Sequence, residues 1–255
     1  MIAQEAKLFL IALQFLTRIP LKRIDPLPDD WLPRSAKYMP LVGALIGVIT
    51  GAIVLISSLI FPWPVPIVIG LASAILLTGA LHEDGLADTV DAFGAGASRE
   101  RCLEIMKDSR IGTYGTLALI ATLALKGTAL AQIDPVSVVR VLIAAYAGAR
   151  LAAVSALALL PYAGGDNAKV SRATSEMTRS EIAIAIATGL IAGLLVLGPV
   201  VFLLSTGLAA LAASVVAWIA RRKIGGYAGD VLGAIEQIYE MAFVVCAVAI
   251  IAGPG

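Results

Sequence analysis

The sequence predicts an all-α protein whose helices cross a membrane about seven times. Of its 255 residues, 59% are hydrophobic and only 15% are charged, whereas soluble domains are about 45–50% apolar and about 25% charged. The mean hydropathy of +0.92 agrees. A soluble domain of this length could not bury so much apolar surface, so we expect one membrane-embedded domain over residues 1–255 in contact with the lipid bilayer. The net charge of +1 gives no reason to expect a nucleic-acid partner.

Seven apolar segments approach the length of about 20 residues that a spanning helix needs. The second and the sixth are short, so each could be tilted or partly re-entrant. Ahead of them, Met1–Thr17 is amphipathic and is expected to lie on the membrane surface, although a span is an open alternative. The seven segments are Tyr38–Ile60, Pro66–Leu81, Ile111–Ala131, Val136–Leu160, Ile182–Leu204, Leu208–Ala220 and Val231–Ile251.

The connections between these segments alternate in length and charge. The short, nearly neutral ones are Phe61–Pro66, Gln132–Pro135 and Ser205–Gly207. The long ones hold nearly all Lys and Arg residues, and basic loops remain in the cytoplasm. We therefore expect a multi-pass protein of the cell membrane whose active site lies on the cytoplasmic face. The long connections are Arg18–Lys37, His82–Arg110, Tyr162–Glu181 and Arg221–Asp230.

The densest group of candidate functional residues directly follows the second apolar segment. Asp84, Asp88 and Asp91 are spaced i, i+4 and i+7, which places them on one face of a helix. Adjacent carboxylates repel each other unless a cation neutralises them, and oxygen ligands suit Mg²⁺ or Mn²⁺. A solvated helix face is the alternative. His82, the only histidine, could orient a carboxylate or bind phosphate, or be structural.

Two basic residues come next along the chain. Lys107 and Arg110 could bind phosphate oxygens, Arg with two parallel hydrogen bonds. Gly112 and Gly115 open the next span with backbone N–H groups that form a ready anion site. Asp108, expected one turn after another acid on a helix, is a further candidate metal ligand. The alternative is an ordinary charge-compensated helix followed by a loop.

A third group precedes the last span. Arg221, Arg222 and Lys223 could bind phosphate, or could act only as topology signals and contacts to lipid headgroups. Gly229 belongs to a glycine-rich loop that could wrap a phosphate. Asp230 is a candidate metal ligand, with helix N-capping as the alternative.

Four charged residues lie inside the predicted spans. Glu236 and Glu240 are one turn apart in the last span, where a charge is costly unless it faces a polar cavity. Lys126 and Arg150 could snorkel or pair with buried carboxylates. Either could also supply charge to a substrate pocket shared with those glutamates.

Taken together, these stretches resemble a known family. His82–Asp91 is similar to the signature His-x-Asp-Gly-Leu-Ala-Asp-Thr-x-Asp of cobalamin synthase, also called adenosylcobinamide-GDP ribazoletransferase. The resemblance covers nearly the whole chain, but Ala92 stands where Gly is usual and Gln237 where an acid is common. The other matching stretches are Phe15–Pro20, Tyr38–Gly43, Met106–Gly112 and Gly225–Ala234.

The resemblance implies an activity and roles for the residues. The family joins adenosylcobinamide-GDP to α-ribazole or its 5′-phosphate, releases GMP and needs a divalent metal, usually Mg²⁺. Asp84 and Asp88 would then hold metal, while Asp91 would be a third ligand or the base that takes the acceptor's proton. Asp230 and Glu240 would complete the polar wall of the substrate cavity.

Two other functions remain open at this point. A phospholipid-type CDP-alcohol phosphotransferase uses similar metal chemistry, but it expects Ala-Arg after the Asp-Gly pair, and Ala87 is followed here by Asp88. A cation-coupled transporter would place its polar groups near the bilayer midplane, whereas most of these groups lie in the connections at one side. The sequence does not indicate an oligomeric state.

Overall fold

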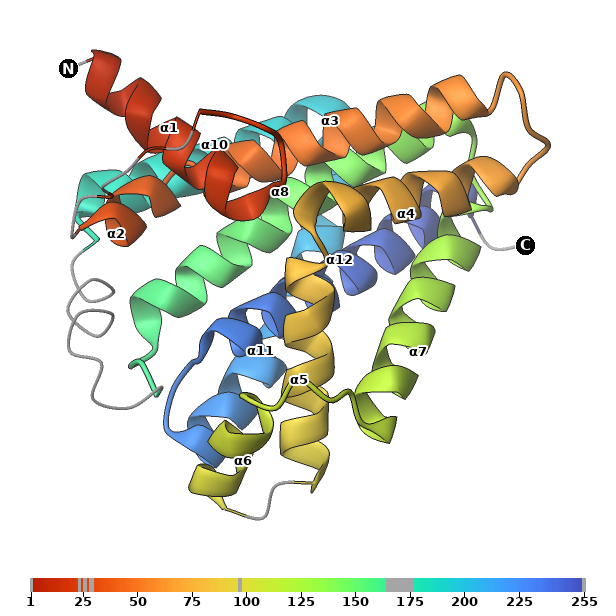
Figure 1. Ribbon diagram of the computed structural model, residues 1–255. Coiled ribbons are helices and arrows are strands. Elements are labelled where there is room, and N and C mark those ends of the chain that lie inside the picture. Colours follow the sequence, from red (N-terminus) through yellow and green to blue (C-terminus); the bar gives the residue numbers. More distant parts are fainter. Residues whose placement is uncertain are drawn as a thin grey trace.

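The computed structural model describes residues 2–22, 24, 27, 30–95, 98–163 and 177–253. Within this part of the chain the regular structure is helical (Figure 1). Parts of the predicted loops Arg18–Lys37, His82–Arg110 and Tyr162–Glu181, including residues 164–176, lie outside the described residues. The helices are α1 (Ile2–Leu16), α2 (Trp31–Ala36), α3 (Met39–Ser57), α4 (Val65–Thr78), α5 (Leu81–Ala95), α6 (Arg99–Ile105), α7 (Thr113–Leu130), α8 (Pro135–Leu159), α10 (Arg179–Leu197), α11 (Pro199–Ile224) and α12 (Gly229–Ala252).

Six of these helices are long and apolar enough to cross a membrane: α3, α7, α8, α10, α11 and α12. The short helices α4 and α5 together would give a seventh span, although they meet at an angle of 88°. The expected all-α class with about seven spans is therefore confirmed. Helix α1 has 15 residues and is not among the six, and its position at the membrane surface stays a prediction.

The chain turns sharply where the second predicted span ends. Gly79 and Ala80 both have left-handed backbone conformations, with φ of 69° and 61°, and a glycine in this conformation is a common helix stop. A Cβ on Gly79 would lie 2.7 Å from Cζ of Arg18, so a side chain at this position would have to displace the guanidinium of Arg18. Helix α5, which carries the acidic motif, therefore runs almost perpendicular to α4 (Figure 1).

One predicted boundary between spans is wrong. The break falls at Gly198, where φ is 74°, and Pro199 begins α11. Gly after a helix and Pro at its first position are the usual stop and start signals. Ser205 is fully buried inside α11, so Ser205–Gly207 is not a connection. The sixth span is accordingly 26 residues long, not the short segment expected.

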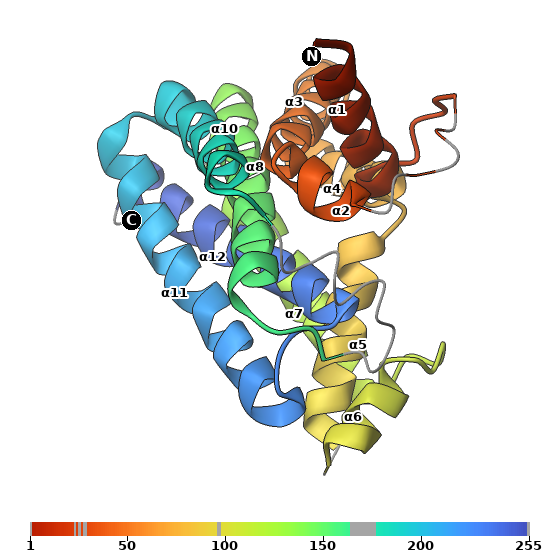
Figure 2. The ribbon, with the colours of Figure 1, turned by 90° about the vertical axis from the view of Figure 1, so that its left-hand side faces the viewer.

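Helix α8 is the centre of the bundle and packs against α3, α10 and α12 (Figure 2). Three glycines of α3, at positions 43, 47 and 51, face it, and such small residues allow two spanning helices to approach closely. A Cβ on Gly47 would lie 2.7 Å from Cα of Ile143, and one on Gly43 would lie 2.8 Å from Cδ of Arg150. This packing fixes the position of Arg150.

The connections divide between two ends of the bundle. In Figure 1 the α3–α4 connection and the C-terminus lie on the right, whereas α2, α6 and the α11–α12 connection lie on the left and at the bottom. The charged connections thus share an end with the acidic helix α5. This arrangement agrees with the predicted alternation of loops.

Candidate functional site

The acidic motif meets the last span at a contact between two glycines. A Cβ on Gly85 would lie 2.7 Å from the carbonyl oxygen of Asp230, and one on Gly233 would lie 3.1 Å from that of His82. Any side chain at either position would push α5 and α12 apart. The contact therefore brings Asp230 of α12 next to Asp84 of α5.

Carboxylates from both helices gather at this crossing. Asp84 is exposed, while Asp88 and Asp230 are partly buried. Asp88 lies close enough to Asp84, Asp230 and Asp91 for their negative charges to repel its own. We call Asp84, Asp88 and Asp230 the acidic cluster.

The acidic cluster offers oxygen ligands of the kind that Mg²⁺ prefers. Among the described residues, no three His, Cys, Asp or Glu side chains lie close enough to hold a metal ion on their own. Mg²⁺ commonly binds through one or two carboxylates and completes its shell with water and substrate phosphate oxygens. The cluster fits an incomplete site of that type, which a phosphate-bearing substrate would finish.

Asp91 makes its hydrogen bonds outside the acidic cluster. Its carboxylate is buried and accepts hydrogen bonds from the backbone N–H groups of Gly112, at 2.7 Å, and Gly115, at 2.9 Å. A carboxylate at the start of a helix is stabilised by those N–H groups and by the helix dipole. The anion site predicted at Gly112 therefore exists, but Asp91 fills it. The expectation that Gly112 offers a free N–H to substrate phosphate is wrong.

The second group of candidates lies in the connection between α6 and α7. Helix α6 ends at Ile105, so Asp108 lies in the connection to α7 and not on a helix as expected. Asp108 accepts hydrogen bonds from the guanidinium of Arg110, at 2.6 Å for Nη2, and this contact lowers the pKa of Asp108 to about 2. Lys107 and Arg110 are exposed. The structure thus pairs Asp108 with a cation instead of placing it among the metal candidates.

The basic group ends α11 on the surface of the molecule. Arg221, Arg222 and Lys223 are exposed, and Arg222 lies over the ring of Trp218, 4.8 Å from its centre. Lys223 Nζ donates to the carbonyl oxygen of Phe93 at 2.7 Å, which ties α11 to the end of α5.

The start of α12 excludes the alternative role of Asp230 as a helix N-cap. The N-cap residue of α12 is Ala228. A Cβ on Gly229 would meet no atom within 4 Å, so the backbone at this position stands next to open space.

A buried charge network lies beside the acidic cluster, within the bundle. Glu240 accepts from Arg150 Nη1 and, at 3.2 Å, from Lys126 Nζ. Glu236 lies 3.2 Å from Arg150 Nε and 2.8 Å from Nε2 of His82. These five side chains from four helices are almost completely buried. The prediction that the two glutamates face polar groups inside the protein is confirmed, and both basic residues pair with them.

Two members of the charge network were not foreseen from the sequence. Gln237 accepts from Lys126 Nζ at 2.8 Å and donates to Glu83 Oε1 at 3.2 Å. The amide thus bridges a cation and a carboxylate, which explains how Gln is accommodated at a position where an acid was expected. The only sequence signal was that Gln237 and Glu83 are polar residues next to apolar stretches.

A cavity of about 280 Å³ joins the acidic cluster to the charge network. His82 and Asp84 of α5 and Asp230 and Glu236 of α12 line the side that these two packed helices provide. The rest is apolar and aromatic, supplied by residues that lie far apart in the sequence: Phe15, Leu16, Leu32, Met39, Leu81, Ala153, Val154, Leu157, Tyr162, Tyr227 and Leu232. We call this space the two-sided cavity.

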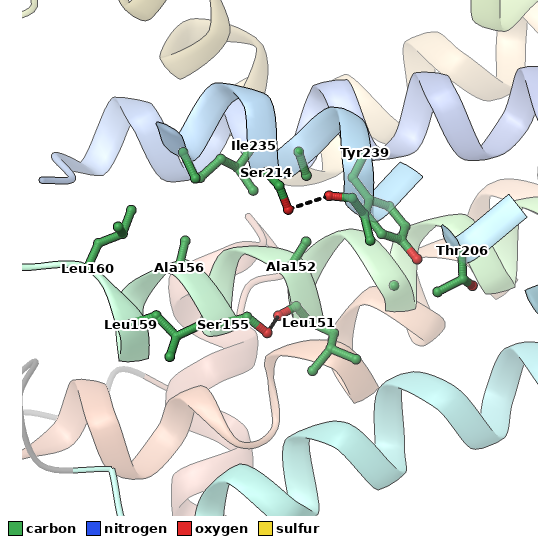
Figure 3. A pocket seen from close by; sticks show the side chains of 14 residues that line it. Leu151, Ala152, Ser155, Ala156, Leu159, Leu160, Thr206, Ser214, Ile235 and Tyr239 are labelled. Carbon is green, nitrogen blue, oxygen red and sulfur yellow. Dashed lines mark hydrogen bonds between the residues drawn. The ribbon is translucent and has the colours of Figure 1, made fainter. Parts of the chain in front are cut away.

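A second cavity of similar volume lies between α8, α11 and α12 (Figure 3). The hydroxyls of Ser155 and Ser214 donate to carbonyl oxygens of their own helices, at 2.8 and 2.7 Å. None of the 14 residues that line this cavity carries a charge. It lacks groups for phosphate chemistry, so the two-sided cavity is the candidate active site.

Comparisons with known proteins agree over nearly the whole chain. The family model described as cobalamin-5-phosphate synthase matches residues 8–248. A protein of Leptothrix cholodnii named adenosylcobinamide-GDP ribazoletransferase is 41% identical over 247 residues, which cover 93% of each chain. Proteins with the same name from Bradyrhizobium diazoefficiens and Shewanella piezotolerans are 42% and 38% identical, over 94% and 93% of this chain and 92% and 93% of their own. No solved structure matches.

Proposed function

Because the chain belongs to the cobalamin-5-phosphate synthase family, we propose that it is an adenosylcobinamide-GDP ribazoletransferase of late cobalamin biosynthesis. It joins adenosylcobinamide-GDP to α-ribazole or its 5′-phosphate and releases GMP. The observation that carries this proposal is the Gly85–Gly233 contact, which sets the acidic cluster at the edge of the two-sided cavity. The relatives' shared name favours this function over a CDP-alcohol phosphotransferase or a cation-coupled transporter.

The reaction breaks the anhydride bond between the two phosphates of the donor and forms a new phosphate ester bond to the acceptor. A sugar hydroxyl of the acceptor attacks the phosphorus that carries the cobinamide. The bond from that phosphorus to the bridging oxygen breaks, and this oxygen leaves with GMP. A carboxylate of the acidic cluster accepts the proton of the hydroxyl. One or two carboxylates of the acidic cluster would hold Mg²⁺, which would supply Lewis-acid neutralisation of charge on the diphosphate.

The buried charge network positions the reacting groups. Glu236 holds His82 at the wall of the two-sided cavity, and Arg150 holds Glu236 in turn. Glu240 lies deeper and acts through Arg150 and Lys126, so it is a positioning residue. Asp91 is also structural, since it fixes the start of α7 against α5.

The same proposal places the active site on the cytoplasmic face of the cell membrane. The acidic cluster lies at the end of the bundle that carries the charged connections, and basic connections remain in the cytoplasm. Nucleotide substrates and GMP are soluble there, while the apolar spans anchor the enzyme in the bilayer.

A product assay tests this function. Purified protein in liposomes receives adenosylcobinamide-GDP, α-ribazole and Mg²⁺, and mass spectrometry follows the joined corrinoid and GMP. We expect both products in equal amounts, and neither with Asp84→Asn protein recovered in equal yield. The absence of both products from folded wild-type protein, with either α-ribazole or its 5′-phosphate as acceptor, would refute the function.

A further inference from the structure

We propose that the two-sided cavity is the binding site of the acceptor nucleoside, which places its flat, apolar base on the apolar side and its sugar hydroxyls at Asp84 and Asp230. This inference rests on the proposed function, because it assigns one of the two substrates of that reaction to one space.

The volume of the cavity selects the smaller substrate. Sites for small molecules usually occupy about 300–1,000 Å³, and a cavity of about 280 Å³ lies just below the lower end of that range. A nucleoside with a bicyclic base fits such a space. A corrinoid, with its large macrocycle, does not fit, so the donor would bring only its diphosphate to the acidic cluster.

The apolar side of the cavity contains two aromatic rings whose backbones are hydrogen-bonded together. Tyr162 and Tyr227 form an edge-to-face pair with ring centres 5.6 Å apart. The backbone N–H of Tyr227 donates to the carbonyl oxygen of Pro161 at 2.9 Å, and the backbone N–H of Ala163 donates to the carbonyl oxygen of Tyr227 at 2.8 Å. Aromatic rings prefer edge-to-face or offset contacts with further rings.

The position of the carboxylates fixes the direction of the bound nucleoside. Asp84 and Asp230 line the cavity and belong to the acidic cluster. With the base on the apolar side, the sugar lies toward these residues, where its hydroxyl can attack the diphosphate of the donor. The opposite orientation would bury sugar hydroxyls against apolar side chains, which costs free energy.

Two adjacent alanines of α8 provide a matched test. Ala153 lines the two-sided cavity, whereas Ala152 lines the second cavity (Figure 3). We expect Ala153→Phe to raise KM for the nucleoside at least tenfold while KM for adenosylcobinamide-GDP stays within twofold. Ala152→Phe should change neither constant. Gly229→Leu, at a cavity position with open space around it, is a second blocking variant in case Ala153→Phe does not fold.

Three results would overturn the proposal: an unchanged nucleoside KM in both blocking variants, a rise in donor KM instead, or an equal effect of Ala152→Phe. Equilibrium dialysis of radiolabelled α-ribazole against each protein separates this inference from the function. If wild-type protein turns over no substrate but binds the nucleoside, and the blocking variants do not bind it, the ribazoletransferase function fails and the nucleoside site stands. If wild-type protein turns over and a blocking variant binds α-ribazole normally, the function stands and the nucleoside site is wrong.

Discussion

Removal of Glu240 should destabilise the protein in a way that a second substitution reverses. In Glu240→Leu, Arg150 keeps Glu236 as a partner, but Lys126 keeps only the side-chain amide oxygen Oε1 of Gln237. Breaking a buried ion pair by removing one partner costs about 3–5 kcal/mol, a large fraction of a total stability of about 5–15 kcal/mol. Lys126→Leu should cost less, because Glu240 then still has Arg150.

The double variant Glu240→Leu/Lys126→Leu tests whether the destabilisation comes from the unpaired charge of Lys126. It removes both members of the pair and leaves Arg150 with Glu236, so it should be more stable than Glu240→Leu alone. The assay is unfolding in mixed micelles with increasing SDS, followed by circular dichroism, on all four proteins of the double-mutant cycle. A double variant less stable than either single one would refute the reasoning, because the two side chains would then contribute independently.

Three further predictions concern the site and the topology. Asp84→Asn and Asp230→Asn should abolish turnover without loss of folded protein, and EDTA should inhibit the wild type until Mg²⁺ is restored; wild-type rates in metal-free buffer would contradict this. Asp91→Ala should lower the free energy of unfolding by about 1–3 kcal/mol, because it leaves two backbone N–H groups without their acceptor. The same SDS unfolding measures this change. Weaker metal binding at unchanged stability would instead make Asp91 a metal ligand. In protein without its native cysteines, Arg101→Cys should react with an impermeant thiol reagent only from the cytoplasmic side and Gln132→Cys only from outside; labelling of both from one side would overturn the topology.

Hydropathy and local signals were enough to predict the class of fold. The number of spans and the alternation of loops follow from apolar segments whose lengths match the bilayer. The error at Ser205–Gly207 arose because hydroxyls can remain inside an apolar helix, where residues such as Ser214 donate to the carbonyl one turn earlier. The boundary lies at Gly198 followed by Pro199, a pair that usually ends one helix and begins the next. Apolar residues continue on both sides of this pair, so hydropathy did not reveal the break.

The site could be predicted only in part, because its partners come from different helices. Spacing along α5 suggests that Asp91 shares a face with Asp84, but it cannot show that the N-terminus of α7 lies against Asp91. In the same way, the sequence indicated that Glu240 needs a partner without showing whether Lys126 or Arg150 supplies it. The structure gives both.

The buried charge network also has a consequence for biosynthesis of the protein. Lys126 and Arg150 lie on α7 and α8, which are translated and inserted well before α12. Until α12 is made, the growing chain holds two cations in the bilayer without the glutamates that neutralise them. The arrival of α12 therefore supplies the missing negative charge and, through Asp230, completes the acidic cluster in one step. A ribosome that stalls before this helix leaves an insertion intermediate in which Lys126 and Arg150 lack these glutamate partners.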